Sequence, residues 1–106
     1  GAKHIVAVEG FFSAVRLDEQ GVPVVALMGT AISAEQIELL RVAGVKSVLL
    51  MLDGDDAGKR ASVTVGHTLS LNLFTRIVML PDDTSPDDLD INTLAAFLPF
   101  PLRNPF

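Results

Sequence analysis

The chain has 106 residues, of which 49% are hydrophobic and 20% are charged, and its formal net charge is −5 at pH 7. These values predict one globular domain, and they exclude a disordered chain and a surface that coats nucleic acid by positive charge alone. The absence of cysteine excludes a disulfide scaffold and thiolate metal sites, and it is compatible with a reducing cytoplasm. The apolar runs are too short to span a bilayer, and the Gly-Ala-Lys start indicates a domain excised from a larger protein.

Strands and helices are predicted to alternate along the chain. In chain order we expect a strand at 3–8, a helix at 11–20, a strand at 22–27, a helix at 33–42, a strand at 46–52, a helix within 55–73, a strand at 76–80 and a helix at 91–98. The strands are nearly continuous apolar runs, which is typical of strands covered on both faces. In the second helix, Ser33 and Gln36 form a capping-box pattern, and Gly44 is the expected stop.

This order predicts an α/β fold with a mostly parallel, four-stranded sheet flanked by helices. We expect a single domain over residues 1–106, with its core at about 3–90 and a short helix and proline-rich tail at 91–106. In parallel sheets, ligands bind beyond the carboxyl ends of the strands. Acidic or loop residues follow all four predicted strands: Glu9, the loop 28–30, the pair Asp53 and Asp55, and the acidic loop 81–90.

The stretch LDGDDAGKR at 52–60 places three carboxylates directly after the most hydrophobic strand. A phosphate-binding P-loop is excluded because Asp53 and Arg60 stand where Gly and Ser or Thr are needed. An EF-hand loop is excluded because Thr64 stands where the last ligand, Glu, is required.

Two interpretations of these acids remain. Asp53 or Asp55 could simply cap the following helix. Alternatively, the acids converge with Glu9 around a divalent cation. Like charges at about 4–6 Å repel by a few kcal/mol at an effective dielectric near 20, and Mg²⁺ would relieve that repulsion while keeping waters for phosphate exchange. We favour the metal interpretation, because capping needs only one aspartate.

Four stretches together resemble the Toprim domain of bacterial-type DNA primases: VEGFFSAV at 8–15, LMGT at 27–30, LDGDDAGKRA at 52–61 and MLPDDTSPDDL at 79–89. The resemblance implies metal-dependent nucleotidyl or phosphoryl transfer on nucleic acid, as the catalytic core of a primase or primase-like protein that makes RNA primers. It also implies Mg²⁺ or Mn²⁺ as cofactor. The sequence departs from the family pattern at Ser85, where primases usually carry Asp, and at Asp56, where they often carry Arg.

Carried over position by position, the resemblance assigns catalytic roles to Glu9, Asp53 and Asp55. The same three residues and Asp87 are the expected metal ligands. The residues expected where phosphate or nucleotide approaches are Gly10, Gly29, Thr30, Gly54 and Lys59. Ordinary turn geometry is the alternative for the glycines, and a solvated helix face is the alternative for Lys59.

The resemblance further implies nucleic acid and nucleoside triphosphates as partners, bound through flanking domains, and a helicase or another replication protein in the cytoplasm. An isolated fragment of this length is expected to be weak or inactive. Two alternatives stay open. One is a Toprim nuclease or topoisomerase-like enzyme, although the chain has no tyrosine to serve as nucleophile. The other is a non-catalytic module that binds nucleotides or a partner, which Ser85 and Asp56 favour.

Overall fold

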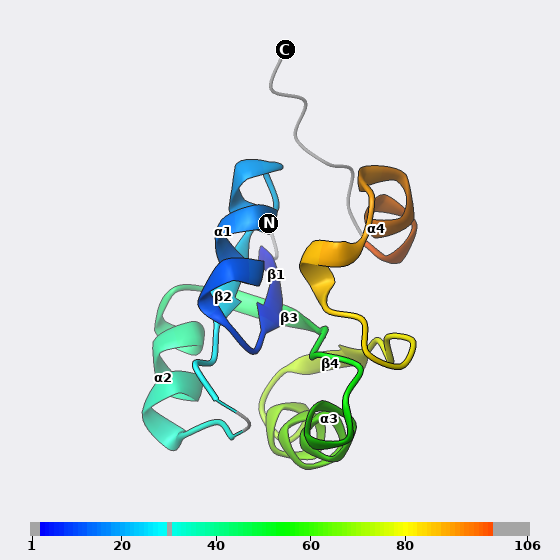
Figure 1. Cartoon of the computed structure of the whole chain (residues 1–106). Helices are drawn as coiled ribbons and strands as arrows, with labels where there is room; N and C mark the ends of the chain where they lie inside the picture. The colour runs from blue at the N-terminus through cyan, green and yellow to red at the C-terminus, as the bar shows by residue number, and fades with distance from the viewer. Residues whose placement is uncertain (1–2, 30, 99–106) are drawn as a thin grey trace.

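A computed structural model describes residues 3–29 and 31–98 of the chain (Figure 1). Its elements are β1 (Lys3–Val8), α1 (Phe11–Glu19), β2 (Val24–Ala26), α2 (Ala34–Val42), β3 (Val45–Leu50), α3 (Asp56–Ser70), β4 (Phe74–Ile77), the short 3₁₀ helix η1 (Pro86–Asp88) and α4 (Ile91–Phe97). Within the described residues, no helix is long and apolar enough to cross a lipid bilayer.

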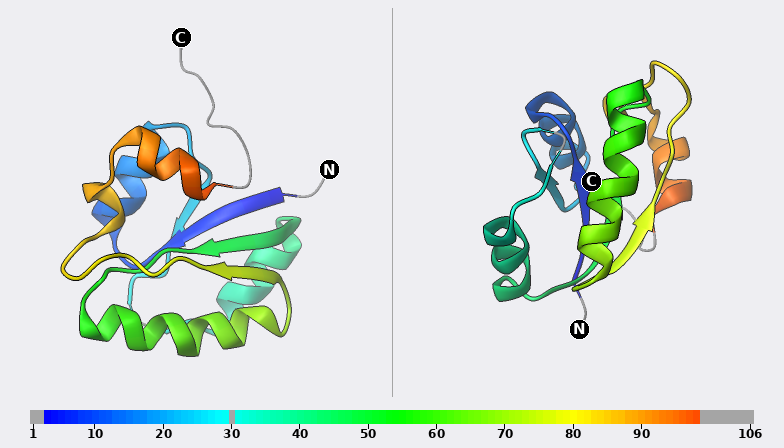
Figure 2. Two further views of the ribbon diagram at one scale, coloured as in Figure 1. Left: turned by 90° about the vertical axis from the view of Figure 1, so that its right-hand side faces the viewer. Right: turned by 90° about the horizontal axis from the view of Figure 1, so that it is seen from below.

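The four strands form one sheet in the order β2-β1-β3-β4, and every neighbouring pair is parallel. This confirms the predicted α/β fold with a parallel sheet. Figure 2 shows α1 and α4 on one face of the sheet and α2 and α3 on the other. The two most buried strands, β1 and β3, are therefore central, and their carboxyl ends lie next to each other.

Each face of the sheet has its own hydrophobic core. Under α2 and α3, Val48 and Leu50 of β3 pack with Ile37, Val65 and Leu69. On the opposite face, a second set of buried side chains packs under α1 and α4: Val6, Val8, Leu17, Leu49, Met51 and Leu94. Burying one such side chain stabilises the fold by about 1.5–3 kcal/mol. Both faces of β1 and β3 are covered, which explains their continuous apolar sequences.

The predicted start and stop of α2 are confirmed. The Ser33 hydroxyl accepts a hydrogen bond from the Gln36 backbone N–H at 3.1 Å, and the Gln36 side chain accepts one from the Ser33 N–H at 2.8 Å. Gly44 follows the helix with φ of +86°, a left-handed conformation that favours glycine. The capping residues in the sequence therefore set both ends of this helix.

The predicted boundaries were wrong at the second strand, where β2 covers only Val24–Ala26 of the predicted 22–27, at the fourth strand and in the acidic loop. β4 begins at Phe74, before the predicted start, because α3 already ends at Ser70 and Phe74 pairs with Ser47. Beyond Ile77 the ladder continues with a hydrogen bond from the Val78 N–H to the Leu50 carbonyl at 2.9 Å. The loop expected at 81–90 contains η1, which begins after Ser85. The proline-rich tail from residue 99 onward lies outside the described residues.

Gly58 allows α3 to begin directly over the end of β3. A Cβ at this position would lie 1.9 Å from the Asp53 carbonyl oxygen, which belongs to the backbone and cannot move aside cheaply. We therefore expect Gly58→Ala to destabilise the fold by about 3 kcal/mol or more, seen as a lower midpoint of thermal unfolding. Gly10→Ala is the matched control, because nothing lies within 4 Å of a Cβ there. Equal midpoints for the two variants would contradict this explanation.

Candidate functional site

The predicted site residues lie at the carboxyl edge of the sheet, which faces the viewer in Figure 1. Glu9 directly follows β1, and Asp53 and Asp55 follow the neighbouring strand β3. Asp87 lies on η1, after the loop that leaves β4. Parallel pairing of β1 with β3 brings the first three together, although more than 40 residues separate Glu9 from Asp53 in the sequence.

Glu9 is fixed by a backbone hydrogen bond, and its carboxyl lies near other negative charges. Its carbonyl accepts a hydrogen bond from the Met28 N–H at 2.8 Å. Its Oε1 is buried and finds no hydrogen-bond partner among the described residues. Burial raises the pKa of the Glu9 carboxyl above its ordinary value, and the charges of Asp53 and Asp55 raise it further. Glu9 thus lies within electrostatic range of both aspartates.

Asp53 connects Glu9 to the acidic loop. Burial raises the pKa of Asp53, followed by the negative charges of Asp55, Asp87 and Asp88. Asp53 therefore interacts electrostatically with each of the other predicted metal ligands, even though they come from different segments of the chain. Asp88 was not predicted from the sequence, because spacing alone does not show which aspartates of the acidic loop lie near Asp53.

Asp55 is the N-cap of α3, as the capping interpretation predicted. Its Oδ1 accepts a hydrogen bond from the Gly58 N–H at 2.6 Å, and its negative charge lies at the positive end of the helix dipole. Capping thus accounts for one oxygen of one aspartate. Capping does not account for the carboxylates of Glu9 and Asp53. Asp55 therefore supports the capping interpretation, and Glu9 and Asp53 leave the metal interpretation open.

Asp87 accepts two hydrogen bonds on the same oxygen. The Ser85 hydroxyl donates to Asp87 Oδ1 at 2.7 Å, and the Ser13 hydroxyl donates to it at 2.8 Å. These two hydroxyls lower the pKa of Asp87 despite its partial burial, and the nearby charge of Arg16 contributes in the same direction. Ser13 was missed from the sequence. Its only signal there is the spacing of four residues to Leu17, which places both on the buried face of α1.

The glycines expected near phosphate fall into two groups. A Cβ on Gly54 would lie 1.9 Å from the Pro81 carbonyl oxygen, and the Gly54 N–H donates to the Thr84 carbonyl at 2.7 Å. Close packing against the acidic loop is therefore enough to require glycine at 54. Gly10 and Gly29 instead have open space at the Cβ position, so close approach of a ligand there remains a prediction. Thr30 lies outside the described residues.

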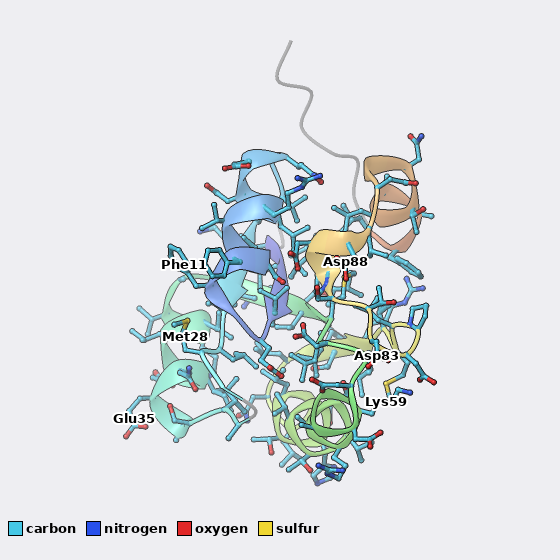
Figure 3. All side chains as sticks on the ribbon, viewed as in Figure 1. Phe11, Met28, Glu35, Lys59, Asp83 and Asp88 are labelled. Carbon is cyan, nitrogen blue, oxygen red and sulfur yellow. The ribbon has the colours of Figure 1, made fainter. Side chains whose placement is uncertain are left out.

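Lys59 forms an ion pair with Asp82, across the gap between α3 and the acidic loop. Figure 3 shows Lys59 near Asp83 at the beginning of α3, on the opposite side of the edge from Phe11 and Met28. An exposed ion pair of this kind contributes little to stability and can be exchanged for another anion. The predicted contact of Lys59 with phosphate is neither required nor excluded by this arrangement.

The carboxylates are close, but they are not arranged as a finished metal site. Among residues 3–29 and 31–98, no three acidic or histidine side chains are positioned so that they could hold one metal ion together. The donor set nevertheless fits a hard divalent cation, because carboxylate oxygens are its preferred protein ligands and Glu9 Oε1 is buried without a partner. Metal ligation by Glu9, Asp53, Asp55 and Asp87 stays a prediction.

Comparison with known proteins identifies relatives of the chain. A profile of the family described as Toprim-like matches residues 6–92. The DNA primase of Staphylococcus epidermidis is 41% identical over 88 residues, which cover 79% of this chain and 14% of that protein. The chain therefore spans only a small part of the length of that curated relative.

Solved structures agree with the sequence relatives. A DNA primase domain from Pseudomonas aeruginosa is 30% identical, with a TM-score of 0.79 over 95% of this chain and 34% of that one. The primase of Aquifex aeolicus, solved with its zinc-binding and RNA polymerase domains, is 37% identical, with a TM-score of 0.67 over 80% of this chain and 21% of that one. From the profile match, the relatives and the parallel sheet with acids at its carboxyl edge, it follows that the chain belongs to the Toprim-like family and is a Toprim domain of the bacterial DNA primase type.

Proposed function

We propose that this chain is the catalytic core of a primase-type nucleotidyltransferase, which uses Mg²⁺ or Mn²⁺ to join nucleotides into RNA primers. The observation that supports this most directly is the electrostatic connection among Glu9, Asp53, Asp55 and Asp87 at one sheet edge. A purely structural edge gains nothing from neighbouring negative charges that raise the pKa values of Glu9 and Asp53. A cation would offset their repulsion, and perturbed carboxyl groups are characteristic of functional sites.

The residues have separate roles in the proposed reaction. Asp53, Asp55 and Asp87 would hold the cation, which when bound neutralises charge that develops on phosphate oxygens. Glu9, with its raised pKa, is suited to accept the proton of the attacking 3′-hydroxyl. Gly10 and Gly29 leave open space beside this edge. Lys59 would exchange Asp82 for a phosphate of the incoming nucleotide.

The substrates of the proposed reaction are nucleoside triphosphates and a nucleic-acid template. A chain with net charge −5 gains no affinity for a polyanion from its own overall charge. We therefore propose that flanking domains of a longer polypeptide supply the cationic surface, and that a helicase or another replication protein is a partner. The cytoplasm, where such replication proteins work, is the compartment that fits this function.

Binding of Mn²⁺ is the direct test of the proposed site. We expect calorimetric titration of the chain with Mn²⁺ to show binding, and we expect Asp53→Ala to weaken that binding by at least about tenfold, because Asp53 is the carboxylate that lies near all the others. Asp18→Ala is the control, since Asp18 is an exposed aspartate on α1. Absence of binding at millimolar Mn²⁺ would leave the non-catalytic module as the function.

The repulsion also predicts how stability depends on pH without metal. A carboxyl whose pKa is raised in the folded state binds its proton more tightly there, so the free energy of unfolding falls as pH rises from the ordinary pKa of 3.8 through the raised pKa of folded Asp53. At pH 7 we therefore expect Asp53→Asn to raise the midpoint of thermal unfolding by roughly 2–4 °C.

The advantage of Asp53→Asn should shrink as pH is lowered through the raised pKa of Asp53, because the wild-type carboxyl then gains its proton. Thermal unfolding followed by circular dichroism in metal-free buffer between pH 4 and pH 8 measures both effects. Asp18→Asn serves as the control and should not change the midpoint. A lower midpoint for Asp53→Asn at pH 7 would show that the carboxylate is stabilising rather than repelled.

The reaction type can be tested in a chimeric primase. In the chimera, residues 6–92 of this chain replace the matching segment of the Staphylococcus epidermidis primase. We expect this chimera to retain measurable primer synthesis, and we expect Glu9→Gln in the chimera to abolish it. Circular dichroism of both chimeras checks that they fold. A folded chimera that nicks supercoiled plasmid with Mn²⁺ but makes no primer would redirect the proposal to the Toprim nucleases.

A further inference from the structure

The hydroxyls of Ser13 and Ser85 both bind Asp87, and we call this pair the serine clamp. Ser13 belongs to the first turns of α1, and Ser85 immediately precedes η1. Both donate to Asp87 Oδ1, at 2.8 Å and 2.7 Å. Ser85 has a single hydroxyl proton, and its second acceptor, Asp88 Oδ2, is farther away at 3.1 Å. The shorter contact to Asp87 is therefore the stronger one.

The serine clamp joins α1, which follows Glu9, to η1, which carries Asp87. Ser13 is 6% exposed, and the residue range of α1 begins two positions after Glu9. Its bond to Asp87 crosses 74 residues of sequence and connects the segment after β1 to the segment after β4. No backbone hydrogen bond joins α1 to η1 among the described residues. The Ser13 hydroxyl thus connects α1 to Asp87 by a direct hydrogen bond, beside the nearby charge of Arg16 on the same helix.

The two hydrogen bonds also determine the orientation of the Asp87 carboxylate. Hydroxyl donors to an ionised carboxylate form charge-assisted bonds, which are short and strongly oriented. Because both end on Oδ1, the carboxylate plane is fixed, and neither hydroxyl occupies Oδ2. In metal sites, partners of this kind orient the ligand, and their loss commonly lowers metal affinity by about 10–100-fold.

We propose that Ser13 and Ser85 are positioning residues for the metal site, which hold Asp87 by Oδ1 so that its other oxygen is presented to a divalent cation. This inference rests on the proposed function, because it assumes that Asp87 is a ligand. It adds to that function two residues that act through Asp87 and touch neither metal nor substrate. It also assigns the link between α1 and η1 a role beyond packing.

The test compares Mn²⁺ affinity in hydroxyl-deletion variants of the whole chain. Electron paramagnetic resonance of free Mn²⁺ gives the dissociation constant at a temperature well below the unfolding midpoint. We expect Ser13→Ala and Ser85→Ala each to weaken binding by about tenfold, and we expect Ser85→Thr, which keeps the hydroxyl, to retain most of the affinity. Ser70→Ala is the matched control, because its hydroxyl bonds to the His67 carbonyl at the far end of α3.

Thermal unfolding without metal separates positioning from stability. If Ser13→Ala does not fold, the half-buried Ser85 carries the test through Ser85→Ala and Ser85→Thr. A lower unfolding midpoint with unchanged Mn²⁺ affinity in the folded variants would overturn the positioning role and leave the proposed function intact. Failure of the wild-type chain to bind Mn²⁺ would overturn both.

Discussion

Mutual repulsion among carboxylates at the carboxyl edge of the sheet is the constraint on which the site depends. Parallel pairing of β1 with β3 places Glu9 beside Asp53 and Asp55, and neither strand can shift without exposing one of the two hydrophobic cores. The fold therefore holds together charges that would separate if they were free to do so. Burial of part of each carboxyl increases the effect.

The acidic side chains at this edge have different hydrogen-bond partners and different pKa shifts. Asp55 caps a helix, and two hydroxyl donors hold Asp87 and lower its pKa. Glu9 and Asp53 have raised pKa values, and the buried oxygen of Glu9 lacks a partner among the described residues. The proposed metal-dependent function would use this division, with some ligands held in place and others whose charge a bound cation would compensate.

Close backbone packing surrounds the site. Gly54 and Gly58 lie where a side chain would collide with the carbonyl oxygens of Pro81 and Asp53. The turn after β3 thereby contacts both the acidic loop and the first turn of α3. The interpretation of these glycines as phosphate-approach residues is not needed to explain them, whereas Gly10 and Gly29, which have open space, keep it as a prediction.

Short-range patterns in the sequence were enough to predict the order of elements, the capped ends of α2 and the family, because hydrophobic period, capping residues and motif spacing are local properties. They also indicated Glu9, Asp53, Asp55 and Asp87 as candidate site residues. They were not enough to place the start of β4, which depends on pairing of Phe74 with Ser47. Nor could they reveal Ser13, whose partner Asp87 is distant in the chain. Only the tertiary structure decides such contacts, since packing of α1 against η1 brings hydroxyl and carboxylate together, and no local pattern encodes their distance.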